Sequence, residues 1–334
     1  MSVHPDPISP DPFDPSRDTY EIADRRAAGG RDPREIRLPR RRTRGWVHAL
    51  LFVLTLLTTT LVGMLHHAGF GFDFRPGDVS FDLAFVLNGF WYSGTILAIL
   101  GCHELGHYFA CRYYQIDVSL PYFLPAPILT GTLGAFIRIR EPIRSKRVLF
   151  DVGVAGPIAG FVVALPALFL GLWLSRVVAI PPAFEGYSLG EPLLFRGVAW
   201  LIWGTPAEGY SLNLHPMAFA AWFGLLATAL NLFPIGQLDG GHISYAVLGG
   251  RWSTIVTLAS VLVAISLTFV SSSWVVWTVL LVTMLVVFGP RHPRTEDEHT
   301  PLDRRRLAVA AFAVVMLVVC FTPAPIEVLE LLPR

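Results

Sequence analysis

Two histidines four residues apart flank a glutamate in one apolar stretch of this chain. The run is His103-Glu104-Leu105-Gly106-His107. On a helix, side chains at i and i+4 lie on one face, with about 5–6 Å between Cβ atoms, so both imidazoles can reach one zinc ion. Glu104 would lie beside that metal without binding it and could take a proton from the bound water. The spacing therefore predicts a hydrolytic zinc site.

The apolar setting of this motif weighs against a chance match. Glu104 is the only acidic residue between Asp82 and Asp117. An ionisable side chain in the middle of a bilayer costs roughly 2.5–3.5 kcal/mol on insertion scales. We therefore expect the motif to be functional.

A catalytic zinc usually has three protein ligands plus water, so a third ligand must come from elsewhere. The metzincin position for a further histidine holds Tyr113, which excludes that class. Asp239 is the only acidic residue between Glu208 and Glu296. It lies near the end of a later apolar segment, at a depth similar to that of the two histidines. A juxtamembrane turn capped by Asp239 is the alternative interpretation.

The residues around Asp239 favour a broken helix. Pro234 lacks an amide donor and is expected to free the carbonyl of Leu230, and glycines at 236, 240 and 241 let the chain leave the helix. A broken helix at membrane depth is tolerated only where it lines a cavity or is packed in protein. His242 is the reserve ligand, while the other lone histidines are more typical of solvated or capping groups, namely His66, His67 and His215.

Composition indicates a membrane protein. Of 334 residues, 53% are hydrophobic and 15% charged, and the mean hydropathy is +0.53, whereas soluble domains carry about 25% charged residues. With a net charge of +1, a nucleic-acid partner is not indicated, and membrane lipids are expected partners. The cysteines lie inside apolar segments, so no disulfide framework is implied; they are Cys102, Cys111 and Cys320.

The predicted fold class is an all-α polytopic membrane protein with about seven transmembrane helices and a re-entrant β-like segment. Crossing a bilayer takes about 20 apolar residues. The candidate spans are Trp46–Leu65, Phe85–Ala110, Val148–Leu174, Ala218–Phe233, Thr254–Val270, Trp274–Phe288 and Leu307–Phe321, and Val198–Trp203 is too short to cross. The β-like segment is Thr130–Arg140, which contains Gly131 and Gly134 and alternates Ile137 and Ile139 with arginines. It could pair with an unwound substrate or be a packing element.

Four segments are expected along the chain. They are a disordered Pro/Arg-rich cytoplasmic tail (1–45), the first span with its outer loop (46–83), a catalytic membrane core (84–245) and accessory spans (246–334). With the tail in the cytoplasm, 22 of the 26 Lys and Arg fall on the cytoplasmic side and four on the other. That asymmetry follows the positive-inside rule and predicts a multi-pass protein with its N-terminus inside.

Several motifs together resemble the site-2 protease family of intramembrane zinc metalloproteases. They are H-E-L-G-H at 103–107, G-T-L-G-A-F-I at 131–137, A-G-P at 155–157 and N-L-F-P-I-G-Q-L-D-G-G-H at 231–242. The sequences of these motifs are most similar to those of the plant-chloroplast and bacterial branch that lacks a PDZ domain. This resemblance covers roughly residues 84–245 and leaves the first and the last three spans without specific motifs.

The resemblance implies a function and its residues. One Zn²⁺ per chain would be bound by His103, His107 and Asp239, with Glu104 as catalytic base and Asn231 binding substrate or the oxyanion. It implies a transmembrane protein substrate that is cleaved on the cytoplasmic side, and we expect a bacterial inner membrane. The residues expected to contact substrate are Gly131, Gly134, Ile137 and Pro234. A metal-ion transporter or channel using the same site and an inactive scaffold homologue are the alternatives.

Overall fold

The computed structural model describes residues 45–329 apart from 74–76, 78–80, 128–129, 182–185 and 298–299. The chain separates into two units, Met1–Thr43 and Arg44–Arg334. The expected disordered tail therefore lies outside the described residues, apart from Gly45.

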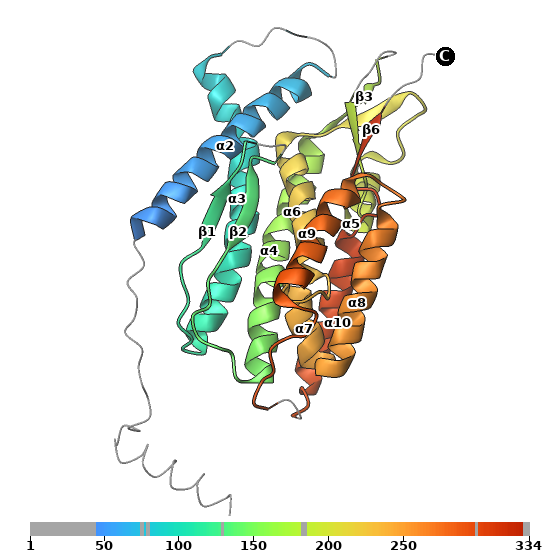
Figure 1. The fold of residues 1–334 in the computed structure, drawn as a ribbon. Coiled ribbons are helices and arrows are strands. Elements are labelled where there is room, and N and C mark those ends of the chain that lie inside the picture. Colours follow the sequence, from blue (N-terminus) through green and yellow to red (C-terminus); the bar gives the residue numbers. More distant parts are fainter. Residues whose placement is uncertain are drawn as a thin grey trace, which may run out of the picture. The chain divides into compact units, whose positions relative to one another are not determined.

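The described part of the second unit contains nine helices (Figure 1). They are α2 (Gly45–Gly71), α3 (Leu83–Tyr113), α4 (Lys146–Leu174), α5 (Leu193–Trp203), α6 (Pro216–Leu232), α7 (Asp239–Leu248), α8 (Gly250–Leu267), α9 (Ser273–Phe288) and α10 (Arg304–Cys320). Each of the seven predicted spans coincides with a helix, and α5 covers the piece judged too short to cross.

Four of these helices are long and apolar enough to cross a membrane: α2, α3, α4 and α8. Helices α6 and α9 are apolar but shorter, and α10 has 17 residues and begins with three arginines. The chain is thus a mostly helical protein with four candidate spans in its described residues, and a count of seven stays a prediction.

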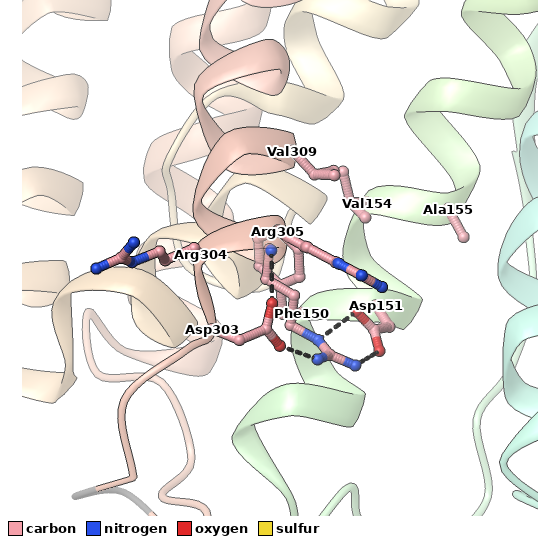
Figure 2. Close-up of a pocket in the computed structure, with 9 residues that line it drawn as sticks. Phe150, Asp151, Val154, Ala155, Asp303, Arg304, Arg305 and Val309 are labelled. Carbon is pink, nitrogen blue, oxygen red and sulfur yellow. Dashed lines mark hydrogen bonds and ion pairs between the residues drawn. The ribbon is translucent and has the colours of Figure 1, made fainter.

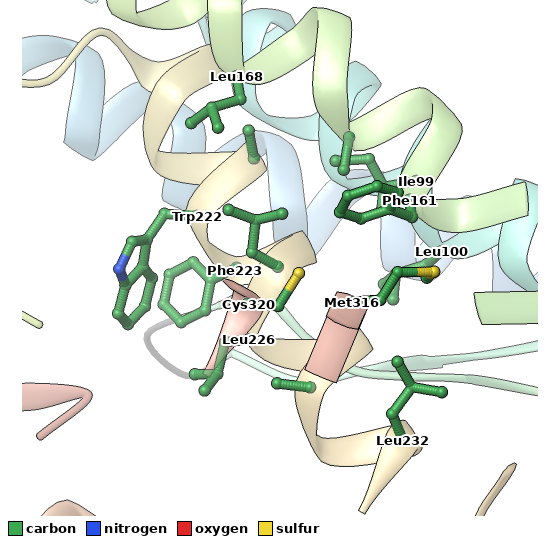
Figure 3. Close-up of a cluster of buried hydrophobic side chains, with 14 of the residues drawn as sticks. Ile99, Leu100, Phe161, Leu168, Trp222, Phe223, Leu226, Leu232, Met316 and Cys320 are labelled. Carbon is green, nitrogen blue, oxygen red and sulfur yellow. The ribbon is translucent and has the colours of Figure 1, made fainter. Parts of the chain in front are cut away.

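The centre of the bundle is formed by α3, α4 and α6. Helix α6 is apolar all round, which is typical of a helix without a solvent face, and Ala220, Trp222 and Leu225 are fully buried. These side chains pack with Ile99 of α3 and Leu168 of α4 in one continuous cluster (Figure 3). The bundle therefore holds α3 and α4 firmly side by side.

A close crossing of α3 and α4 depends on a glycine. A Cβ at Gly106 would lie only 2.4 Å from the carbonyl oxygen of Ala155. Small residues let helix backbones approach each other inside a membrane. The crossing lies at the H-E-x-x-H motif and brings α4 against it.

Short strands make the expectation of an all-α protein too narrow. Strand β1 (Tyr122–Pro125) pairs with β2 (Thr132–Phe136), β3 (Arg176–Ala179) with β5 (Tyr210–Asn213), and β4 (Gly186–Leu189) with β6 (Ile326–Leu329), all antiparallel. Strand β4 lies in a stretch rich in Pro and Gly that favoured irregular loop. Its partner is near the end of the chain, so no local pattern indicates it.

The β1–β2 hairpin confirms the extended segment expected within Thr130–Arg140. Its turn packs on α2: a Cβ at Gly131 would lie 2.6 Å from Cα of Thr59, and Gly131 has φ +73°. Thr58 of α2 donates its hydroxyl to the Gly131 carbonyl at 2.7 Å. The hairpin is therefore fixed to α2, and its depth in a membrane stays a prediction.

The chain breaks between α6 and α7, ahead of Asp239. Contrary to expectation, the carbonyl of Leu230 is not free, because the Phe233 amide donates to it at 3.2 Å. Gly240 permits the sharp return, since a Cβ there would lie 2.0 Å from the Leu232 carbonyl oxygen. Asp239 thus starts a new helix instead of ending the previous one.

Candidate metal centre

The two histidines of the motif meet inside the bundle as their spacing predicts. His103 and His107 lie one turn apart on α3 and are 6% and 7% exposed. Their Nε2 atoms are 3.2 Å apart. Both rings therefore aim a nitrogen at the same point.

Asp239 completes the group from the first turn of α7. Its carboxylate oxygens lie 3.2 Å from Nε2 of His103 and 3.3 Å from Nε2 of His107. Zinc–nitrogen and zinc–oxygen bonds of about 2.0–2.1 Å at a tetrahedral angle separate neighbouring ligand atoms by about 3.3 Å. The three side chains therefore have the ligand types and the mutual spacing that zinc requires, and they form a candidate metal-ligating group in the described residues.

Helix α4 fixes the tautomer of His107. The Nδ1 atom of His107 lies 2.7 Å from the carbonyl oxygen of Val152 and must donate to it, which leaves the Nε2 lone pair for a metal. Metal-binding histidines are commonly oriented by such a partner. The ring fits because residue 156 is glycine, since a Cβ at Gly156 would lie 2.0 Å from Nε2 of His107.

Sequence reasoning missed these roles of Val152 and Gly156. The stripe of Gly153, Gly156 and Gly160 predicts close helix packing, and each of the three faces a histidine: His242, His107 and His103. The stripe of glycines was therefore the sequence signal for a close approach to α4, although it does not show that histidines pack against it.

Glu104 lies beside the metal-ligating group and is not part of it. Its side chain is 7% exposed, and the backbone of Ile137, just beyond β2, lies close to its carboxylate. The hairpin thus brings Ile137 next to Glu104, and the expected contact of Ile137 with substrate stays a prediction.

Asn231 reaches the same point from the last turn of α6. Its Nδ2 atom lies 3.3 Å from Nε2 of His103. An amide donor is thereby available next to the group formed by the histidines and Asp239.

The remaining expected contacts lie farther out. Gly131 packs against α2, and a Cβ at Gly134 would meet nothing within 4 Å, so the backbone there faces open space. The carbonyl of Pro234 accepts the hydroxyl of Thr257 in α8 at 3.2 Å. No contact of these three residues with the metal-ligating group is found in the described structure.

His242 is tied to a histidine that the sequence did not single out. Nδ1 of His292 lies 2.7 Å from the Pro293 carbonyl, so it donates there and leaves Nε2 as an acceptor. Nδ1 of His242 donates to that Nε2 at 2.7 Å. The ring of His292 also stacks on Tyr245 of α7 at 4.4 Å, and burial lowers the pKa of His292. The loop after α9 thus holds α7, the helix that begins with Asp239.

The model of peptidase family M50 matches residues 91–272. The chain belongs to peptidase family M50. The matched residues 91–272 contain the β1–β2 hairpin and the five candidate site residues, which are His103, Glu104, His107, Asn231 and Asp239. The family confirms the resemblance drawn from the sequence motifs.

Curated relatives agree with the family. The chain is 34% identical over 249 residues to "Probable zinc metalloprotease EGY2, chloroplastic" of Oryza sativa subsp. indica, covering 74% of this chain and 45% of the relative. The Arabidopsis thaliana protein of the same name is 33% identical over 208 residues, which is 62% of this chain and 37% of the relative. The chain spans less than half the length of these relatives. No solved structure matches it significantly.

The chain thus belongs to peptidase family M50 and is similar to proteins named as probable zinc metalloproteases. The roles of the individual site residues remain predictions. The structure supplies the distances between these residues.

Proposed function

We propose that this chain is an intramembrane zinc metalloprotease that hydrolyses peptide bonds in or near transmembrane segments, with its active site near the cytoplasmic face. The observation that carries the proposal is the convergence of His103, His107 and Asp239, each of which places one ligand atom within 4.8 Å of those of the other two. Two of these lie on α3, a helix long and apolar enough to cross a membrane.

In this proposal the three side chains hold one zinc ion per chain. Bound zinc supplies Lewis acidity: it polarises the scissile carbonyl and brings the pKa of a bound water toward about 7. The hydrogen bond from His107 to Val152 keeps Nε2 deprotonated for the metal.

Glu104 moves the protons. Its carboxylate accepts the proton of the attacking water and returns it to the leaving amine, as a general base and then a general acid. The backbone of Ile137 lies close to that carboxylate, and we propose that it orients Glu104. The amide of Asn231 donates to the developing oxyanion, a role supported by its position 3.3 Å from Nε2 of His103.

Substrate must present an unwound segment, because helical hydrogen bonds shield its carbonyls. We propose that the hairpin near Glu104 receives the segment by strand addition. Gly131, Gly134, Ile137 and Pro234 are proposed as substrate contacts, and Ile137 has the strongest support, through its contact with Glu104.

The membrane in which the protein works is part of the proposal. An N-terminus in the cytoplasm follows from the arginine distribution. The curated relatives are named as chloroplastic, which gives no support to the expected bacterial inner membrane. Membrane lipids and a transmembrane protein substrate are the proposed partners.

One experiment separates protease, transporter and inactive scaffold. Detergent-purified protein should contain about one zinc per chain and cleave a transmembrane test peptide. Zinc without cleavage, together with zinc flux in proteoliposomes, would indicate a transporter. Neither cleavage nor flux would indicate a scaffold.

A further inference from the structure

A pocket of about 790 Å³ opens between α4 and the first turn of α10 (Figure 2). It lies on another side of α4 from the metal-ligating group. One end of its lining is charged and the other is apolar. The lining residues are Phe150, Asp151, Val154, Ala155, Asp303, Arg304, Arg305, Arg306 and Val309.

The charged end of the pocket is positive. Both acidic residues there are bound to one arginine: Arg306 donates to Asp151 at 2.8 and 2.5 Å and also bonds Asp303. The hydrogen bonds from Arg306 to Asp151 raise the pKa of Arg306, so the guanidinium stays charged.

Two more arginines have no such partner. Within the described part of the chain, no ion pair involves the exposed side chains of Arg304 or Arg305. Arg305 extends from α10 toward α4, whereas Arg304 points away (Figure 2). The lining holds three arginines and two aspartates, which leaves one net positive charge that an anionic ligand would neutralise.

The other end of the pocket continues into an apolar seam. Val309 of α10 faces Val154 of α4 in the lining, and farther along the same two helices Phe312 meets Phe161 with ring centroids 6.3 Å apart. Phe312 remains 44% exposed. A ligand here thus meets arginine at the helix start and apolar side chains beyond it.

We propose that this pocket binds the headgroup of an anionic phospholipid, whose acyl chains lie along the α4–α10 seam. Arginines bind phosphate oxygens strongly, and basic pockets between membrane helices are a recurrent site for such headgroups. A free phosphate would use the same arginines, but it would leave the apolar seam unused. The seam therefore favours the lipid.

Lipid binding to the detergent-purified full chain, measured by native mass spectrometry, tests this assignment. Wild-type protein should retain phosphatidylglycerol over phosphatidylcholine, and Arg305→Gln should reduce that preference about fivefold, the contribution of one arginine near an anionic lipid. The matched control is Arg251→Gln, an exposed arginine in the first turn of α8 and outside the pocket. The preference of Arg251→Gln for phosphatidylglycerol over phosphatidylcholine should stay within about twofold of that of wild type, because Arg251 lies outside the pocket.

Glycerol phosphate, the headgroup without chains, serves as competitor. If millimolar glycerol phosphate or inorganic phosphate displaces the lipid completely, the anion alone is the ligand and the lipid assignment is wrong. Equal retention by Arg305→Gln and wild type would also overturn it. Zinc content and thermal unfolding of each variant, measured in parallel, show whether a loss of binding reflects a loss of fold.

Discussion

At the residue scale, Asp239 connects helix α7, which it begins, with helix α3. Its carboxylate reaches both histidines of α3, while its backbone begins α7. His242 lies on the same short helix, yet its Nδ1 donates to His292 in the loop after α9. The geometry thus supports the proposal that Asp239, and not His242, is the third ligand.

Asp239→Ala should lower bound zinc and proteolysis together. Loss of a residue that hydrogen-bonds to a metal ligand weakens metal affinity about 10- to 100-fold, so loss of the ligand itself should weaken it more. His242→Ala should keep most of the zinc. Metal analysis after dialysis against a zinc buffer distinguishes them, and the reverse pattern would make His242 the ligand.

The histidines and Glu104 were predictable because helical spacing is local. Asp239 was singled out as the only acidic residue in a long apolar stretch and Asn231 through the resemblance, but the sequence does not contain their distances to α3. Val152 and Gly156 could not be predicted, because their roles depend on where α4 crosses α3. Tertiary packing decides such contacts, and a carbonyl oxygen leaves no sequence signal.

At the element scale, the segment after β2 presents alternate amides to opposite sides. The amide of Arg138 donates to the hydroxyl of Ser119 and that of Arg140 to the Asp117 carbonyl. The backbone of Ile137, the residue before Arg138, lies close to Glu104 instead. Alternation in an extended chain explains this arrangement.

Ile137→Pro should therefore lower proteolysis at least about tenfold while zinc stays bound, because proline deletes the amide donor. Ile137→Val keeps that amide and should be near wild type. Arg140→Pro should instead lower the thermal stability, since it removes the bond to Asp117. If Ile137→Pro lost zinc as well, the segment would be a packing element.

The helices of the bundle were predictable from apolar runs, but their ends and partners were not. The α6–α7 break follows from Pro234 and the glycines around Asp239, whereas the 3.2 Å bond from Phe233 to Leu230 does not. The pairing of β4 with β6 joins segments far apart in sequence, so only the folded chain shows it.

At the scale of the whole molecule, large apolar side chains cover the outside of the bundle. On α8 and α9, Leu262 is 64% exposed, Val276 71% and Val286 78%. Exposed apolar surface of this extent is typical of a surface that faces lipid. Combined with the arginine asymmetry, it supports an orientation with the loop after α9 inside.

Single cysteines in a variant that lacks Cys102, Cys111 and Cys320 can test this orientation in intact cells. Arg291→Cys, in the loop after α9, should be shielded from an impermeant thiol reagent, and Glu191→Cys should react. Both positions are exposed. Labelling at 291 without labelling at 191 would invert the orientation and place the active site on the opposite face.

The most direct test of the central claim is mass-spectrometric mapping of the products from a transmembrane test peptide incubated with purified protein. Wild type should cut within or at the edge of the apolar segment. Glu104→Gln should keep zinc and lose about 10²- to 10⁴-fold in rate, because an amide cannot accept the proton. Cleavage confined to the soluble flanks, or equal cleavage by Glu104→Gln, would contradict an intramembrane zinc protease with Glu104 as its base.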